Sequence, residues 1–308
     1  QVGALNNQFS PAGMQVTPGA LFGSYNALVT AANVFYSPDI AGHTLPIGHT
    51  TNTIGTASSI IQMTGFEYHN NAGWSVAKDT TTTWAIGYQG DMTYPWLSWM
   101  EAPLASQRFS VHTISDREDF SHLNDNLDGN YVLGGDVDLS TGSAIDDAFI
   151  TGVFTGDLDG QGFTVSGLAI NASSKDSIGL FSQVSGASIK DLTIDNFNVT
   201  GRNKSGLIIG EIINLGIVTI QDILIKNSQL TGSQDIGGVV GKVDNKDGLL
   251  IIRNVVNQAD ITATDTNSYV GGFIGRGFFN IIIENSENTG TVSGNNIVGG
   301  IIGEYGQR

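Results

Sequence analysis

The sequence has no cysteine and few basic residues, and these two shortages exclude several classes of protein. Without cysteine, the 308-residue chain cannot form a disulfide scaffold or a thiolate metal site. Its 13 lysines and arginines stand against 29 aspartates and glutamates, which gives a formal charge of −16. An acidic surface repels nucleic-acid phosphates, so we expect no nucleic-acid partner.

Long apolar runs and proline are also scarce. No apolar run reaches the roughly 18 residues that a membrane-spanning helix needs, so no membrane span is expected. The chain has 6 prolines, 41 glycines, 40% hydrophobic residues and 14% charged residues, a composition that can bury a core and argues against disorder. The opening residues show neither methionine nor a secretion signal, which indicates a processed chain or a piece of a longer protein.

Composition divides the chain near Pro103. All 4 tryptophans and all 4 methionines lie in the first hundred residues, whereas most charged residues follow them. We therefore predict two regions, residues 1–102 and residues 103–308. The first has an irregular, aromatic-rich end, and the second is repetitive.

The second region repeats with a period of about 31 residues. One motif opens with isoleucine, carries Asp, Asn or Glu within the next two positions, and closes near a Thr-Gly pair. Its opening isoleucines, separated by 31, 32 and 31 residues, are Ile189, Ile220, Ile252 and Ile283. A glycine-rich turn motif alternates with it at 178–182, 206–210, 237–241, 271–275 and 299–303. Two motifs that stay in step over four turns indicate a repeat architecture.

The repeats predict an all-β fold. Isoleucine and valine alternate with polar residues, a pattern typical of strands. Short strands recurring once per repeat favour a parallel β-helix, or β-solenoid, whose coils stack about 4.8 Å apart and bury aliphatic rows. The turn glycines permit either a positive φ or a close approach of two backbones. We expect the four motif isoleucines to form one column inside the coils.

A short capping helix is predicted near residues 116–127. Ser115 to Glu118 has the pattern of a capping box. Phe120, Leu123 and Leu127 follow at helical spacing, and Gly129 can end the helix. Such a helix would cover the open end of the solenoid, where exposed strands invite edge pairing.

These motifs resemble the GLUG-motif repeats of large bacterial surface proteins. The GGVVG, GGFIG and GGIIG turns match the motif that names the family, and residues 154–168 are similar to its lead-in segment. Asp157 and Ser182 depart from the usual pattern. The resemblance implies a parallel β-helix, extracellular or on the bacterial cell surface, that serves as a stalk or adhesive surface. It also implies that residues 1–102 end a preceding GLUG-type module.

Two groups of residues are candidate sites. Asp157 and Asp159 are candidate calcium ligands, because Ca²⁺ is held by carboxylate and turn carbonyl oxygens; the alternative is that they are solvated turn acids. Tyr94, Trp96 and Trp99 are candidate carbohydrate-stacking residues, and the alternative is that these rings close the end of a core. No other cofactor is expected.

Signs of catalysis are weak. The five histidines never form the His-Glu-x-x-His spacing of a zinc peptidase. Asp136 and Asp138 would share one side of a strand, as in a glycosidase pair, but outward polar residues of a repeat give the same pattern. The threonine run 80–83 would suit ice binding only as a ladder repeated once per coil, and the run does not recur.

The sequence therefore predicts a non-enzymatic structural or adhesive segment of a large bacterial surface or secreted protein. The expected partners are proteins or glycans on a host cell or a neighbouring cell. Two alternatives remain open. One is a polysaccharide-acting β-helix enzyme or, because GLUG repeats also accompany immunoglobulin A peptidases, an accessory domain of such a peptidase. The other is a filament formed by end-to-end self-association.

Overall fold

The computed structural model describes residues 111–213 and 216–306, together with seven two-residue strands between Phe35 and Phe109. The chain divides into two compact units, residues 1–110 and 111–308. Each unit is described by itself. The predicted limits of the first region, and its character as the end of a preceding module, stay predictions.

The strands of the first unit pair in both directions. β1 pairs with β2, and β3 with β4, in parallel, whereas β4–β6 and β5–β7 are antiparallel. The strands are β1 (Phe35–Tyr36), β2 (Thr56–Ala57), β3 (Val76–Ala77), β4 (Trp84–Ala85), β5 (Met92–Thr93), β6 (Trp96–Leu97) and β7 (Arg108–Phe109).

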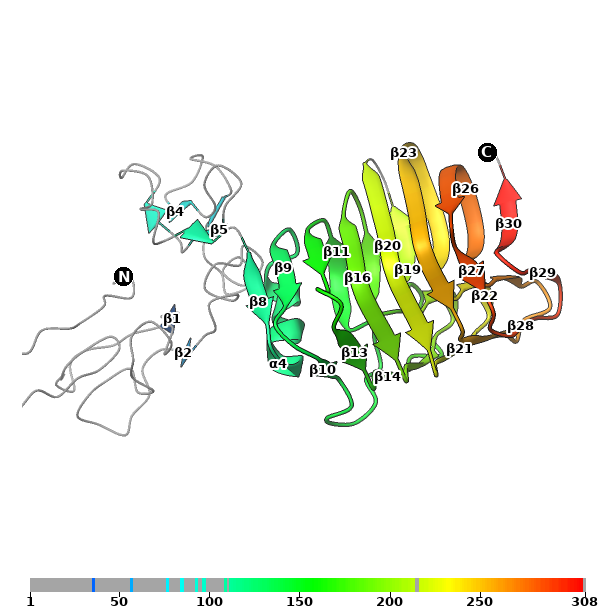
Figure 1. Cartoon of the computed structure of the whole chain (residues 1–308), viewed down its shortest axis with the longest axis horizontal. Helices are drawn as coiled ribbons and strands as arrows, with labels where there is room; N and C mark the ends of the chain where they lie inside the picture. The colour runs from blue at the N-terminus through cyan, green and yellow to red at the C-terminus, as the bar shows by residue number, and fades with distance from the viewer. Residues whose placement is uncertain are drawn as a thin grey trace, which may run out of the picture. The chain divides into compact units, whose positions relative to one another are not determined.

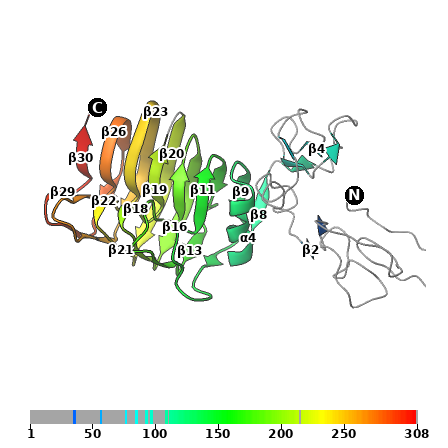
Figure 2. The ribbon, with the colours of Figure 1, turned by 180° about the vertical axis from the view of Figure 1, so that it is seen from behind.

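From residue 111 the chain winds into a β-solenoid of about six coils of about 31 residues (Figures 1 and 2). The strand pairs of this unit are parallel, as predicted, since each coil hydrogen-bonds to the next. The longest ladder comprises β8 (His112–Ile114), β9 (Asn130–Leu133), β12 (Asp157–Asp159), β16 (Ser188–Asp195), β20 (Ile217–Lys226), β23 (Val240–Asn257) and β26 (Ile274–Glu284).

Further ladders form the other sides of the coils. One joins β11 (Ile150–Phe154), β15 (Phe181–Val184), β19 (Ile209–Ile213), β23, β26 and β30 (Ile302–Gly306). A five-stranded sheet contains β14 (Ala169–Asn171), β17 (Asn198–Thr200), β21 (Gln229–Gly232), β24 (Asp260–Ala263) and β28 (Val292–Ser293). A four-stranded sheet contains β18 (Asn203–Gly206), β22 (Gln234–Gly237), β25 (Tyr269–Gly271) and β29 (Ile297–Gly299). The short strands β10 (Val137–Asp138), β13 (Thr164–Ser166) and β27 (Glu287–Asn288) complete the longest ladder.

The four motif isoleucines form the predicted column. Ile189 pairs in register with Ile220, Ile220 with Ile252, and Ile252 with Ile283. The first three are 0% exposed, and Ile283 in the last coil is half-buried. The β-solenoid prediction is therefore confirmed, and the hydrophobic effect of these aliphatic columns holds the coils together.

The third residue of the isoleucine motif bends each strand. Asp191, Asp222, Asn254 and Asn285 have φ values of 54°, 54°, 52° and 49°, a left-handed conformation that Asp and Asn tolerate. The extra residue makes Leu192, three positions after Ile189, the next inward side chain, so the expected strict alternation is wrong at this point. The Asp or Asn of the motif is thus a conformational requirement.

The turn glycines are needed for close backbone approach. A Cβ added at Gly237 would lie 2.1 Å from the carbonyl oxygen of Val240 and 2.5 Å from the amide nitrogen of Gly275 in the next coil. None of the described glycines of this motif has a positive φ. Of the two reasons that the sequence left open, close packing between coils is the one observed.

The capping helix is shorter than predicted and begins one residue later. Helix α4 (Arg117–Ser121) continues as a 3-10 helix, η2 (His122–Asp125), so Leu127 and Gly129 lie outside it. Asp116, not Ser115, is the N-cap, and its carboxylate accepts a hydrogen bond from the Asp119 amide at 2.9 Å. The predicted capping box is therefore wrong by one position.

Helix α4 lies at the N-terminal end of the coils (Figure 1). Phe120 and Leu123 are fully buried, and the Phe120 ring meets Phe149 edge to face, with centroids 5.8 Å apart. The helix thus supplies apolar side chains at this end of the core. Within residues 111–213 and 216–306, no helix is long and apolar enough to cross a membrane.

Candidate functional site

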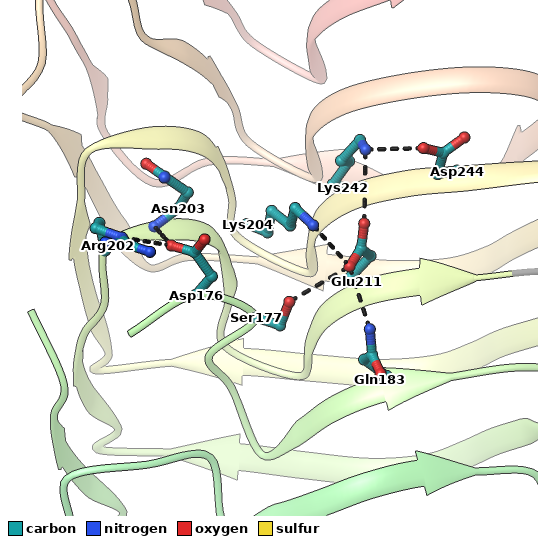
Figure 3. A network of polar contacts seen from close by, with 9 residues as sticks. All are labelled: Asp176, Ser177, Gln183, Arg202, Asn203, Lys204, Glu211, Lys242 and Asp244. Carbon is teal, nitrogen blue, oxygen red and sulfur yellow. Dashed lines mark hydrogen bonds and ion pairs between the residues drawn. The ribbon is translucent and has the colours of Figure 1, made fainter. Parts of the chain in front are cut away.

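Polar side chains face each other across the glycine turns, one coil after another (Figure 3). One column directly follows the last residue of each turn motif, which is glycine or, at 182, serine. It lies in register on β15, β19, β23, β26 and β30: Gln183, Glu211, Lys242, Arg276 and Glu304. The facing column comes two residues before the first turn glycine: Ser177, Lys204, Asp235 and Tyr269. We call these two columns the turn network.

Glu211 is the centre of the turn network. Its side chain is 7% exposed, and its Oε2 lies 3.0 Å from Lys204 Nζ while its Oε1 lies 3.5 Å from Lys242 Nζ. Gln183 Nε2 and Ser177 Oγ donate to Oε2 at 3.3 Å and 3.4 Å. A buried carboxylate is tolerated only when it is paired and hydrogen-bonded, and Glu211 meets both conditions with groups from neighbouring coils.

The two cations that follow Glu211 in its column, Lys242 and Arg276, also contact several groups each. Lys242 Nζ contacts Asp244 Oδ2 at 2.8 Å. The guanidinium of Arg276 lies 4.6 Å from the Tyr269 ring centroid and 5.0 Å from that of Phe278, and its Nε is 2.7 Å from Glu304 Oε2. Aromatic faces attract such a cation. The turn network therefore ties successive coils in one register.

Among the described carboxylates of the turn network, Asp235 is the one without an ion pair, whereas Glu211 and Glu304 each have at least one. It is 7% exposed, and its Oδ1 has no hydrogen-bond partner among the described residues. Burial raises the pKa of this carboxyl, against the opposing charges of Arg276, Lys242 and Lys204. Burial of a carboxyl without a compensating partner costs stability, so Asp235 weakens the array locally.

Next to the turn network, Asp176 binds residues 202 and 203 of the following coil. Its Oδ1 accepts hydrogen bonds from Arg202 Nε at 2.7 Å and from the Asn203 amide at 3.2 Å (Figure 3). The hydrogen bond from Arg202 lowers the pKa of Asp176. This contact again joins residues of two successive coils.

The turn network is arranged for cohesion more than for catalysis. Glu211 and Asp244 each contact a lysine within 3.5 Å, so the charges of both carboxylates are paired within the protein. A shallow depression of about 480 Å³ lies elsewhere, beside α4, and is lined by Arg117, Asp138 and Phe149 among others. Hydrogen bonds from Ser140 lower the pKa of Asp138, the opposite of what a general acid needs.

The proposed calcium ligands lie on β12, on either side of the inward Leu158. Asp159 Oδ2 is 2.9 Å from Lys190 Nζ, and its Oδ1 accepts the Gln161 amide at 2.9 Å. Burial acts to raise the pKa of Asp159, but the hydrogen bonds from Lys190 and Gln161 outweigh it and lower the pKa. In the described part of the chain, no three histidines, aspartates or glutamates gather as a metal site. Calcium binding at Asp157 and Asp159 stays a prediction.

The other candidates add no convergent site. Tyr94, Trp96 and Trp99 lie where the structure describes no side chains, so carbohydrate stacking there stays a prediction. Asp136 Oδ1 accepts the Thr164 amide at 2.8 Å, and Asp138 Oδ1 accepts the Ser140 amide at 2.8 Å. Each carboxylate of this pair therefore accepts a hydrogen bond from a backbone amide.

The sequence reasoning did not find the turn network. A signal was present, because a charged residue directly follows the last glycine of four successive turn motifs: Glu211, Lys242, Arg276 and Glu304. A charged residue at one fixed place in every turn indicates a ladder of side chains, since equivalent positions stack in a solenoid.

The comparisons with known proteins link the coils to two very different contexts. Residues 117–227 match the family described as the M26 IgA1-specific metallo-endopeptidase N-terminal region. Halomucin from Haloquadratum walsbyi (strain DSM 16790 / HBSQ001) is 29% identical over 117 residues, which represent 33% of this chain and 1% of halomucin. The chain thus matches a small part of a much longer protein. No solved structure matches it, and the GLUG assignment stays a prediction.

Proposed function

We propose that this chain is a non-enzymatic structural segment of a large extracellular or cell-surface protein. In this proposal it is a stiff β-solenoid that separates other parts of the protein and presents its side faces for adhesion. The observation that carries the proposal is the unbroken stacking of coils in one register, from Leu158 through Ile189, Ile220 and Ile252 to Ile283.

The mechanism is geometric. Each coil adds about 4.8 Å along the axis, because adjacent coils are joined as parallel strands. The aliphatic columns resist separation of the coils, and the contacts of Glu211 with Lys204 and Lys242 resist slippage between them. A segment built in this way keeps its length and its outward side chains in fixed positions.

The sequence and the comparisons support an extracellular location. A formal charge of −16 suits a soluble repeat protein. Similarity to about 1% of halomucin supports a place within a far longer polypeptide. The proposed partners are glycans or proteins on a host cell or a neighbouring cell.

Two alternatives have one observation each. The match of residues 117–227 favours an accessory region beside an immunoglobulin A peptidase, which would use the same stiff solenoid as a spacer. The last described coil exposes Ile297, Val298 and Tyr305 by 39%, 43% and 55%, an apolar surface that either a following coil of the same polypeptide or a second molecule would cover. A filament-forming chain would show a concentration-dependent mass in sedimentation experiments.

Two measurements on the full chain test the proposal. The first is an assay for hydrolysis of a polysaccharide panel and of immunoglobulin A, in which we expect no cleavage. The second is pulsed EPR on the spin-labelled variant Asp159→Cys/Glu284→Cys, whose positions are four coils apart in one ladder. We expect one narrow distance distribution near about 20 Å. Hydrolysis that Asp136→Asn/Asp138→Asn abolishes, or a broad distance distribution, would contradict the proposal.

A further inference from the structure

The five-stranded sheet carries an outward ladder of hydroxyl and amide side chains. Asn171, Thr200, Thr231, Thr262 and Ser293 lie in register, one per coil, on β14, β17, β21, β24 and β28. A second outward column, two residues earlier, is Ala169, Asn198, Gln229 and Asp260. The threonine ladder that the run at 80–83 failed to supply is therefore present elsewhere in the chain.

Several charged and amide side chains on the outward side of the longest sheet contact one another between coils. Lys190 contacts Asp159 in the coil before it at 2.9 Å. Arg253 contacts Glu284 in the next coil at 2.7 Å. Asn254 Nδ2 donates to Asp222 Oδ1 at 2.7 Å. Such pairs stabilise the coils and occupy the hydrogen-bonding groups of these side chains.

The five-stranded sheet differs over its first three strands. Within the described part of the chain, the side chains of Asn171, Asn198, Thr200, Gln229 and Thr231 make no hydrogen bond or ion pair. Asn171, Asn198 and Gln229 are exposed, and the two threonines are half-buried. We call these five residues the hydroxyl face. Beyond it, Thr262 and Ser293 bond to each other, with their hydroxyl oxygens 3.1 Å apart.

The hydroxyl face is a regular grid of donors and acceptors. Rungs repeat about every 4.8 Å along the coil axis, and the two columns lie about 6.6 Å apart along the strands. Each hydroxyl or amide both donates and accepts a hydrogen bond. A ligand that matches the grid needs hydroxyl groups that repeat at intervals along an extended chain.

The charge of the grid selects among such ligands. Asp260 is the one charged side chain in the two columns, and neither column has a lysine or arginine. With a formal chain charge of −16, an anionic polymer would be repelled. We propose that the hydroxyl face binds an extended neutral polysaccharide along the coil axis. This inference rests on the adhesive part of the proposed function and names its ligand.

Binding by one chain is expected to be weak. One net hydrogen bond changes affinity roughly fivefold, and no aromatic ring stacks on the ligand at this face. An extended polymer that meets several such faces would gain avidity without new contacts.

Affinity gel electrophoresis of the full chain tests the proposal. Native gels contain one soluble neutral polymer each: dextran, galactomannan, xyloglucan or hydroxyethyl cellulose. The test variant is Thr200→Val/Thr231→Val, which removes two hydroxyls but keeps side-chain shape and strand preference. The matched control is Thr193→Val/Thr219→Val, half-buried positions on β16 and β20 of the longest sheet. We expect one polymer to retard the parent chain and the control equally, and the test variant to bind at least fivefold more weakly.

The contrary outcomes are distinct. Equal retardation of the parent chain and the test variant, or no retardation by any of the four polymers, would overturn the hydroxyl face as a glycan site. Inhibition of ice recrystallisation that the test variant loses, without polymer binding, would overturn it in favour of ice. None of these results affects the solenoid spacer, which fails only if the EPR distances or the hydrolysis assay contradict it.

Discussion

Replacement of Ile220 by alanine tests whether the aliphatic columns hold the coils together. Ile220 is 0% exposed and lies between Ile189 and Ile252 in the interior column. The substitution removes three carbons, each contributing about 0.8 kcal/mol by burial. The remaining cavity adds to this loss, so we expect a destabilisation of about 3–4 kcal/mol.

Ile217 provides the matched control on the same strand. It is 59% exposed, so Ile217→Ala should change stability by less than about 0.5 kcal/mol. Urea unfolding should be followed by far-UV circular dichroism, because all 4 tryptophans lie in the first hundred residues and would report on the other unit. Hydrogen exchange of the β16, β20 and β23 amides measures the same loss locally. Equal shifts for Ile220→Ala and Ile217→Ala would refute the reasoning.

Three further predictions concern the turns, the turn network and the N-terminal end. Gly237→Ala should destabilise the chain by about 1–3 kcal/mol, because the added Cβ would lie 2.1 Å from a backbone oxygen. The control Gly135→Ala should leave stability unchanged, because no atom lies within 4 Å of its Cβ. The midpoint of thermal unfolding measures both effects. In a double-mutant cycle, Glu211→Gln and Lys242→Met should show a coupling energy of about 1–3 kcal/mol, and additivity would argue against a shared network. Burial lowers the pKa of His112 from 6.5 to about 4, so the folded chain binds fewer protons and loses stability as pH falls from 6.5 to 4. His112→Leu should remove up to about 3 kcal/mol of that loss. Urea midpoints measured from pH 6.5 to 4 should therefore fall less steeply for His112→Leu than for the parent chain, and equal pH dependence of the two proteins would show that the histidine is solvated.

The fold could be predicted from the sequence because its patterns repeat. The same inward position recurs in each coil, and its spacing in the sequence gives the coil length of about 31 residues: Ile189, Ile220, Ile252 and Ile283. The start of α4 was misplaced because Ser115 and Asp116 are both good N-caps. Only the contact of the Asp116 carboxylate with the Asp119 amide distinguishes them.

The turn network was harder to predict, because its partners belong to different coils. Glu211 is stabilised by Lys204, seven residues earlier, and by Lys242, 31 residues later. Which of several charged residues in a turn point toward each other depends on the left-handed conformation of Ser177, Lys204 and Asp235. Single-sequence propensities do not specify such conformations for a serine or a lysine.

Engineered disulfides give the most direct test of the stacked register, since the parent chain has no cysteine. Ser188 and Thr219 are direct partners on β16 and β20, whereas Gln221 lies two residues further along the same side of β20. Partner Cα atoms about 4.8 Å apart permit a disulfide, but the offset pair, at about 8 Å, does not. We predict rapid oxidation of Ser188→Cys/Thr219→Cys and little oxidation of Ser188→Cys/Gln221→Cys. Equal cross-linking of both pairs, or preferential cross-linking of the offset pair, would contradict the register on which the account is built.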